Sequence, residues 1–240
     1  MALPADKVGK ANKAGVELLK SLREEFASEE TKIVISGAMG PLGDAYQLSE
    51  ETRDGDGRSS GSGSRLEDVM GCYRGQVAAL AEAGADMISI MTVTSTDEAV
   101  AAVLLAREAS LPVWVSFTVE TDGKLLDGRT GERFINDVDD ATDRYASYFG
   151  INCAHPTHFL DALRGLSKEA RARIREVRVN ASDKSHAELD ESEELDRGDP
   201  KVLGGLHAKI RELLPRLCVV GGCCGTDEEH VREMAKVLLE

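Results

Sequence analysis

The stretch Leu217-Cys218-Val219-Val220-Gly221-Gly222-Cys223-Cys224-Gly225-Thr226 joins an apolar run to a glycine-framed pair of cysteines. Its first four residues have the length and the β-branched content of a buried strand. The Thr226-x-x-Glu229 pattern that follows is typical of a helix start. The cysteine pair is therefore expected just after a strand and just before a helix, where parallel α/β folds place their functional side chains.

The same strand-then-helix unit recurs along the chain. Short runs that are apolar on both faces and bounded by glycine or proline are typical of buried parallel strands, and amphipathic stretches separate them. The predicted strands are residues 32–37, 87–93, 112–119, 148–152, 176–180 and 217–220, preceded by one helix over roughly residues 7–26. Repeated units of this kind predict a parallel sheet with right-handed crossovers, either a closed barrel or an open doubly wound sheet.

The first glycine-rich turn favours the barrel. Gly37-Ala38-Met39-Gly40-Pro41 lacks the G-x-G-x-x-G spacing of dinucleotide-binding folds, and its proline stands where a phosphate-binding helix would begin. We therefore expect an α/β fold of the (β/α)8 TIM-barrel type, with about six βα units instead of eight. We interpret residues 1–240 as a single barrel domain and predict a flexible loop over residues 53–64 from its Gly, Ser and Asp content.

The overall composition excludes several classes of protein. The chain has 29 Lys and Arg against 43 Asp and Glu, and its net charge of -14 repels nucleic-acid phosphates and anionic membranes. It contains no run of eighteen apolar residues, and its start lacks a cationic stretch followed by an apolar one. Five cysteines without the spacing of a disulfide framework fit a reducing cytosol. We expect a cytoplasmic protein with neither a nucleic-acid nor a membrane partner.

Three cysteines are spaced so that they can bind one metal ion. Cys153 ends the run Gly150-Ile151-Asn152-Cys153, so that it, like Cys223 and Cys224, follows a strand and faces a helix start. Adjacent Cα atoms lie about 3.8 Å apart, below the usual ~4.4–6.8 Å of a disulfide, so the neighbouring pair is not expected to be bonded. Three thiolates without an evident fourth protein ligand describe a Zn²⁺ site with one open position.

Such a site favours sulfur chemistry over hydrolysis. Three thiolates around Zn²⁺ leave one formal negative charge, and an electron-rich zinc activates water poorly. It suits the binding of a substrate thiol as a thiolate that attacks an alkyl electrophile. A structural zinc site, or no zinc, is the alternative; a closed site would need a fourth ligand, and Cys72 and Cys218 are better interpreted as buried apolar residues. His155 and His158 are close enough in sequence to ligate or to support the ligands.

Several segments give the chain a resemblance to a known family. It resembles the homocysteine S-methyltransferase family, the zinc-dependent homocysteine-binding barrels, from about residue 6 to the end. The resemblance implies that Cys153, Cys223 and Cys224 hold Zn²⁺ and that the sulfur of homocysteine takes the fourth position. It further implies methyl transfer to homocysteine from a sulfonium such as S-methylmethionine or S-adenosylmethionine, or from another activated donor, giving methionine. The matching segments are residues 36–41 with 43–44, 116–120, 150–153 and 219–226, with 152–159 and 180–190 similar to one bacterial-type branch.

Three substrate-binding residues also follow from the resemblance. Glu120, after the third predicted strand, would meet the amino group of homocysteine; a solvated loop carboxylate is the alternative. Asn152 would orient the substrate or tie the turn in which it lies. Asn180 would line the pocket or satisfy a turn.

The chain departs from the family pattern at its N-terminus. Family members begin with a βα unit that carries an Asp-Gly-Gly-rich turn and continue with a second strand, whereas this sequence starts at the helix after that strand. We expect a domain incomplete at its N-terminus, with two exposed strand edges that favour a homo-oligomer. The leading hypothesis is a zinc-dependent thiol methyltransferase. The alternatives are a catalytically incomplete zinc-binding paralogue or fragment that acts through a partner, and a metal-dependent lyase or hydrolase on the same barrel.

Overall fold

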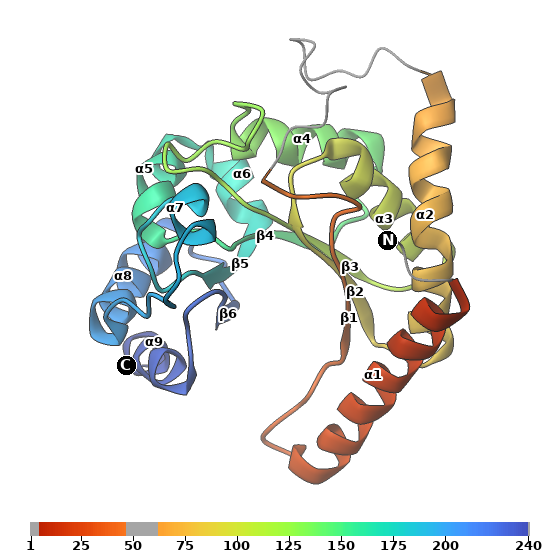
Figure 1. Cartoon of the computed structure of the whole chain (residues 1–240), viewed down its shortest axis with the longest axis horizontal. Coiled ribbons are helices and arrows are strands. Elements are labelled where there is room, and N and C mark those ends of the chain that lie inside the picture. Colours follow the sequence, from red (N-terminus) through yellow and green to blue (C-terminus); the bar gives the residue numbers. More distant parts are fainter. Residues whose placement is uncertain (1–4, 47–61, 240) are drawn as a thin grey trace.

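A parallel six-stranded sheet organises the molecule in the computed structural model, which describes residues 5–46 and 62–239 (Figure 1). The strands follow one another in chain order across the sheet, and each pairs in parallel with the next. They are β1 (Ser36–Met39), β2 (Met87–Val93), β3 (Val113–Phe117), β4 (Tyr148–Asn152), β5 (Ile174–Val179) and β6 (Val219–Gly222). The predicted six parallel strands are confirmed.

Helices cover the convex side of this curved sheet (Figure 1). They are α1 (Ala5–Phe26), α2 (Ser62–Glu82), α3 (Thr96–Glu108), α4 (Gly131–Ala141), α5 (Pro156–Gly165), α6 (Lys168–Arg173), α8 (Pro200–Leu213) and α9 (Glu228–Leu239). The short α7 (His186–Asp190) has no buried residue and lies instead on the side of Cys153 and Cys224, at the carboxyl ends of the strands. Within the described part of the chain, β1 and β6 form the two edges of the sheet. The fold is therefore a curled half-barrel of the TIM-barrel type, and the closed eight-stranded form is not reached by these six strands.

The core lies between the sheet and the helices. Side chains alternate between the two faces of each strand, and the outward-facing set is fully apolar along the middle strands. Phe134 of α4 packs against Phe117 and Phe149, with ring centroids 5.4 and 6.5 Å apart. All three rings are buried, and burial of each stabilises the fold by roughly 2–3 kcal/mol.

The concave face of the sheet is more polar than the convex face. The Ser116 hydroxyl donates to the Glu176 carboxylate at 3.1 Å, and the Arg178 guanidinium lies 3.1 Å from the same carboxylate. Trp114 and Tyr148 stack on this face with ring centroids 5.5 Å apart. The concave face therefore carries a carboxyl group, that of Glu176, which is fully buried.

The first strand begins later than predicted. Residues 32–35 precede it, and Val34 is 63% exposed. The Asp86 carboxylate accepts a hydrogen bond from Ile35 N at 2.7 Å, and the Ile35 carbonyl accepts from Asp86 N and Met87 N. A side chain thus takes the place that a strand partner would have, which the apolar pattern alone could not reveal.

The start of α9 differs from the prediction in a way that matters for the cysteine pair. The Asp227 carboxylate, and not Thr226, accepts from the amides of Glu229 and His230, at 3.0 and 3.4 Å. The Thr226 hydroxyl instead donates to the Cys223 carbonyl at 2.7 Å. The predicted cap was therefore wrong by one residue, and the threonine holds the cysteine turn.

The flexible loop predicted over residues 53–64 lies largely outside the described residues. Residues 62–64 belong to α2, so the predicted loop extended too far at that end. Among the described helices, none combines the length and the apolar content that a membrane crossing requires.

Candidate metal centre

Three cysteine sulfurs meet at the carboxyl ends of β4 and β6. The Sγ atom of Cys153 lies 3.0 Å from that of Cys223 and 3.6 Å from that of Cys224. The Sγ atoms of the neighbouring pair are 4.0 Å apart. The three sulfurs therefore form a small triangle, as the sequence analysis predicted.

Strand order explains how residues seventy positions apart come together. Both β4 and β6 pair with β5, so the residues that follow them lie on either side of the β5 carboxyl end. Cys153 N donates to Arg178 O at 2.9 Å, and Cys223 N donates to Val179 O at 2.8 Å. The parallel ladder thus continues into the cysteine turns and fixes their separation.

The backbone of Cys153 is strained. Its φ of 58° places a residue with a side chain in the left-handed region, which costs on the order of 1 kcal/mol. The Asn180 amide nitrogen donates to the Cys153 carbonyl at 3.0 Å, and the Thr118 hydroxyl donates to the same carbonyl at 3.3 Å. Two buried side chains therefore hold the turn that directs this sulfur toward the other two.

The sulfur triangle fits a tetrahedral metal ion. A Zn–S bond of about 2.3 Å implies S···S separations of about 3.8 Å in a tetrahedral site. Two of the observed separations, 3.6 and 4.0 Å, are close to this value, and the third, 3.0 Å between Cys153 and Cys223, is shorter. In the described residues, the group of potential ligand atoms within 4.8 Å of one another comprises only Cys153, Cys223 and Cys224. These residues could therefore hold a metal and leave one coordination position for a further ligand.

The thiols also affect one another electrostatically. Hydrogen bonds from the Cys153 and Cys223 thiols lower the pKa of Cys224 well below its usual range. The same contacts raise the pKa of Cys223, because its thiol donates and its thiolate would be close to the other sulfurs. Negative charge therefore concentrates on Cys224, the most exposed of the three.

A cavity of about 620 Å³ opens directly above the sulfur triangle. Two of the predicted substrate residues, Glu120 and Asn180, line it together with Cys153 and Cys224. Six carboxylates also line it, which favours ligands with positive charge. They belong to Asp44, Glu120, Asp190, Glu193, Glu194 and Asp196.

Asn152 contacts Thr92 of β2 and does not line the cavity. Its carboxamide oxygen accepts from Thr92 N at 2.9 Å, and its nitrogen donates to the Thr92 hydroxyl at 2.6 Å. Thr92 has a φ of 58°, so Asn152 stabilises a second left-handed residue at a strand end. Since Asn152 is 2% exposed and is not part of the cavity lining, the structure gives it the turn-tying role.

Two ring-bearing residues that line the cavity, Tyr46 and His186, were not among the site residues predicted from the sequence. The Tyr46 and His186 rings pack with centroids 4.1 Å apart. Burial, and then the contact with Cys153, raises the pKa of Tyr46 above its ordinary value. Tyr46 follows a glycine-rich turn without periodicity, so no local signal could have identified it.

His186, unlike Tyr46, does have a sequence signal, because it lies in the segment 180–190 that resembles one branch of the family. Its Nε2 atom lies 3.4 Å from the Thr118 hydroxyl. Burial lowers the pKa of His186, while the nearby Glu120 carboxylate opposes this shift. The imidazole is therefore favoured in its neutral form beside the sulfur triangle.

The whole chain matches a described protein family. Residues 1–238 match the family described as homocysteine S-methyltransferase. A methionine synthase from Mycobacterium leprae (strain TN) is 28% identical over 243 residues, which cover 96% of this chain and 18% of that protein. The chain thus spans less than a fifth of the length of this curated relative. With its fold and its three-cysteine site, the chain belongs to the homocysteine S-methyltransferase family.

Solved structures share the fold. The apo form of the homocysteine methyltransferase MmuM from Escherichia coli superposes with a TM-score of 0.70 at 19% identity, covering 99% of this chain and 77% of that one. Its metallated form gives a TM-score of 0.70 at 21% identity, covering 98% of this chain and 72% of that one. At this identity the likeness establishes the architecture alone.

Proposed function

We propose that this chain transfers a methyl group from an activated donor to the thiol of homocysteine, giving methionine, with Zn²⁺ held by Cys153, Cys223 and Cys224. The observation that carries the proposal is the triangle of sulfurs at the base of a cavity large enough for two small molecules. Membership of the family supports the thiol acceptor.

The chemistry follows from the donor set. Zn²⁺ bound by three thiolates would hold a substrate thiol as a thiolate that stays nucleophilic. The transfer breaks the bond between the methyl group and the donor and forms a sulfur–methyl bond on homocysteine. The thiol proton passes to solvent, and the donor leaves without its methyl group. A sulfonium donor leaves as a neutral thioether, which needs no further acid.

The cavity residues have separate roles in this proposal. Glu120 would pair with the amino group of homocysteine, since its carboxylate lines the cavity beside the sulfurs. Asn180 lines the same cavity but also holds the ligand turns, so its role toward the substrate is secondary to its role toward the metal. Tyr46 and His186 would shield the thiolate from water. The remaining carboxylates would favour a sulfonium donor over an anionic one.

A catalytically incomplete zinc-binding protein is the second candidate, because the half-barrel leaves β1 and β6 as edges in the described residues. Such edges offer unpaired backbone groups to a partner or to a second copy of this chain. These exposed edges are also the reason for predicting a homo-oligomer, which stays a prediction.

Metal analysis followed by an activity assay separates the candidates. Protein purified without chelator should contain about one zinc per chain. It should methylate homocysteine with S-methylmethionine or S-adenosylmethionine, and Cys224→Ala should abolish both properties. In the structure, Cys72 and Cys218, which were predicted to be buried, are both exposed. Cys72→Ala, which alters the exposed cysteine of α2, is therefore the matched control and should alter neither. Zinc binding without methyl transfer would favour the second candidate, and the absence of zinc would contradict both.

A further inference from the structure

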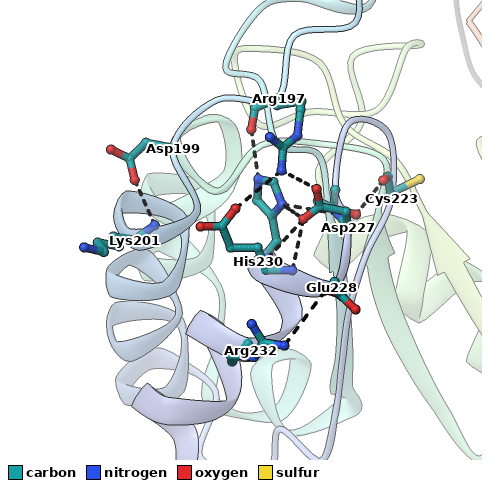
Figure 2. A network of polar contacts seen from close by, with 10 residues as sticks. Arg197, Asp199, Lys201, Cys223, Asp227, Glu228, His230 and Arg232 are labelled. Carbon is teal, nitrogen blue, oxygen red and sulfur yellow. Dashed lines mark hydrogen bonds and ion pairs between the residues drawn. The ribbon is translucent and has the colours of Figure 1, made fainter.

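We propose that His230, Asp227 and Arg197 form a clamp that positions one wall of the substrate cavity against residues 223–225, the metal-binding loop that carries two of the three cysteines. The wall is the segment of residues 189–196, most of which line the cavity. The inference rests on the proposed function for the identity of the ligand, but the clamp itself is defined by contacts within the chain (Figure 2).

The wall is held at its two ends. At the first end, His186 packs on Tyr46 and its Nε2 atom lies 3.4 Å from the Thr118 hydroxyl. At the second end, the Asp196 carboxylate accepts from the Ser182 hydroxyl at 2.9 Å. Between these ends, the hydrogen bonds that the structure gives for residues 187–195 join residues of the segment and its own helix cap. The position of the wall therefore depends on its anchors.

His230 provides the anchor immediately after the wall. Its side chain is fully buried, and its Nε2 atom lies 2.8 Å from the Arg197 carbonyl. A carbonyl only accepts, so Nε2 carries a hydrogen and donates it. The Nδ1 atom lies 2.8 Å from an Asp227 carboxylate oxygen. One imidazole thus joins residues 197–198, the strap that follows the wall, to Asp227, which precedes α9 and caps it.

Arg197 completes the clamp from the opposite side. Its guanidinium contacts the Asp227 carboxylate (Figure 2). It also lies 3.5 Å from the Glu229 carboxylate. Asp227 in turn accepts from the first amides of α9, so the clamp is attached to a rigid element. Because Arg197 is held through both its carbonyl and its guanidinium, the strap has a defined orientation as well as a defined position.

Two glycines show how closely the strap approaches the metal-binding loop. A side-chain carbon at Gly198, whose φ is 53°, would lie 2.2 Å from the Ala181 carbonyl oxygen. A side-chain carbon at Gly225, whose φ is 77°, would lie 2.5 Å from the Asp196 carbonyl oxygen. Both positions require glycine, because the strap passes between the end of β5 and the residue after Cys224.

The metal ligands themselves are held by other bonds. Cys223 N donates to Val179 O at 2.8 Å, and Cys224 O accepts from Ala181 N at 2.9 Å. These backbone bonds to β5 do not involve the clamp. Loss of the clamp should therefore displace the cavity wall while the sulfur triangle keeps its geometry. His230 is accordingly a positioning residue for the substrate cavity.

Two substitutions of His230 separate the two halves of the clamp. His230→Gln places an amide nitrogen near the former Nε2 position and can still donate to the Arg197 carbonyl. His230→Asn places it near the former Nδ1 position, so it keeps the Asp227 contact and loses the carbonyl. Arg197→Ala is a milder variant that removes only the guanidinium. Arg232→Gln on α9, which alters an exposed cation 4.0 Å from Glu228, is the matched control.

Hydrogen exchange on the zinc-loaded protein is the first readout. His230→Asn should raise the exchange rate of amides in residues 189–198 about tenfold, the effect of losing one buried hydrogen bond. Arg197→Ala should raise it less, while His230→Gln and Arg232→Gln should stay close to wild type. Zinc content should remain about one per chain in all four variants.

Kinetics provide the second readout. His230→Asn should raise KM for homocysteine about tenfold and leave kcat within about threefold. Unchanged exchange in both His230→Asn and Arg197→Ala, or lost zinc with unchanged exchange, would overturn the clamp. Faster exchange in a protein whose wild type transfers no methyl group would uphold the clamp and reject the proposed function instead.

Discussion

The side chain of Asn180 joins the two halves of the metal centre. Its oxygen accepts a hydrogen bond from Cys224 N at 3.2 Å, and its nitrogen donates to the Cys153 carbonyl at 3.0 Å. Asn180 is 2% exposed and follows β5, the strand between the two cysteine turns. One carboxamide therefore sets the distance between turns that are seventy residues apart in the sequence.

Substitution of Asn180 should weaken metal binding. Asn180→Ala removes both hydrogen bonds, and Asn180→Asp keeps the acceptor while losing the donor. Loss of a group that orients metal ligands typically lowers affinity about 10–100-fold, so we expect the larger loss for alanine. Competition with a zinc-binding dye measures the affinity. Asn136→Ala, at an exposed position of α4, is the control, and equal affinities for all these proteins would contradict the assigned role.

Glu120 should discriminate between thiols that carry an amino group and thiols that do not. We expect Glu120→Gln to raise KM for homocysteine about tenfold with little change in kcat, because the lost pairing acts equally in the bound and transition states. With 4-mercaptobutyrate, which is homocysteine without its amino group, the same variant should behave like the wild type. Asp122→Asn, two residues further on, is the control. An equal effect on both thiols would show that Glu120 acts on something other than the amino group.

Removal of zinc should make the sulfur triangle sensitive to oxidation. The Sγ atoms of Cys153 and Cys223 are 3.0 Å apart, so a mild oxidant such as diamide, itself reduced to the hydrazine, should join two of the three sulfurs in a disulfide. Peptide mapping by mass spectrometry identifies the pair. Zinc should protect the thiols, and equal oxidation with and without zinc would argue against metal binding at these residues.

Glu176 should make the stability of the fold depend on pH. Burial raises the pKa of Glu176 to about 8, while Arg178 and Ser116 oppose the shift. Because this pKa is raised above its unfolded value, the folded state binds more protons, and the contribution of Glu176 to stability is lost as the pH rises from about 4.5 to about 8.

Glu176→Gln should remove this dependence. The variant should exceed the wild type in free energy of unfolding at pH 8 by on the order of 2 kcal/mol, and the difference should shrink toward pH 5. Urea unfolding at several pH values gives these free energies. A difference that is constant over the range, or that grows as the pH falls, would contradict the assignment.

The parallel sheet and the sulfur triangle could be predicted from the sequence, because both follow from local patterns. Apolar runs mark the strands, and Cys153 and Cys223 each follow one of them. In a parallel sheet all such positions meet at one edge, so their convergence could be predicted. The boundary of β1 could not, since it depends on the Asp86 side chain from another element.

The pairing of Tyr46 with His186 and the clamp depend on tertiary contacts, which leave no periodic pattern in the sequence. The Tyr46 and His186 rings contact each other although the residues are 140 positions apart, and His230 contacts Arg197 through a backbone carbonyl that any residue could supply. The role of Asn152 was open for the same reason. Its partner Thr92 lies two strands away, and the left-handed conformation of that threonine is not encoded by its identity.

X-ray absorption at the zinc edge, with and without homocysteine, tests the central claim most directly. The account predicts three sulfurs and one lighter ligand on the zinc of the free protein, and four sulfurs at about 2.3 Å once homocysteine is added. Coordination that already holds four protein ligands, and that does not change when homocysteine binds, would contradict it.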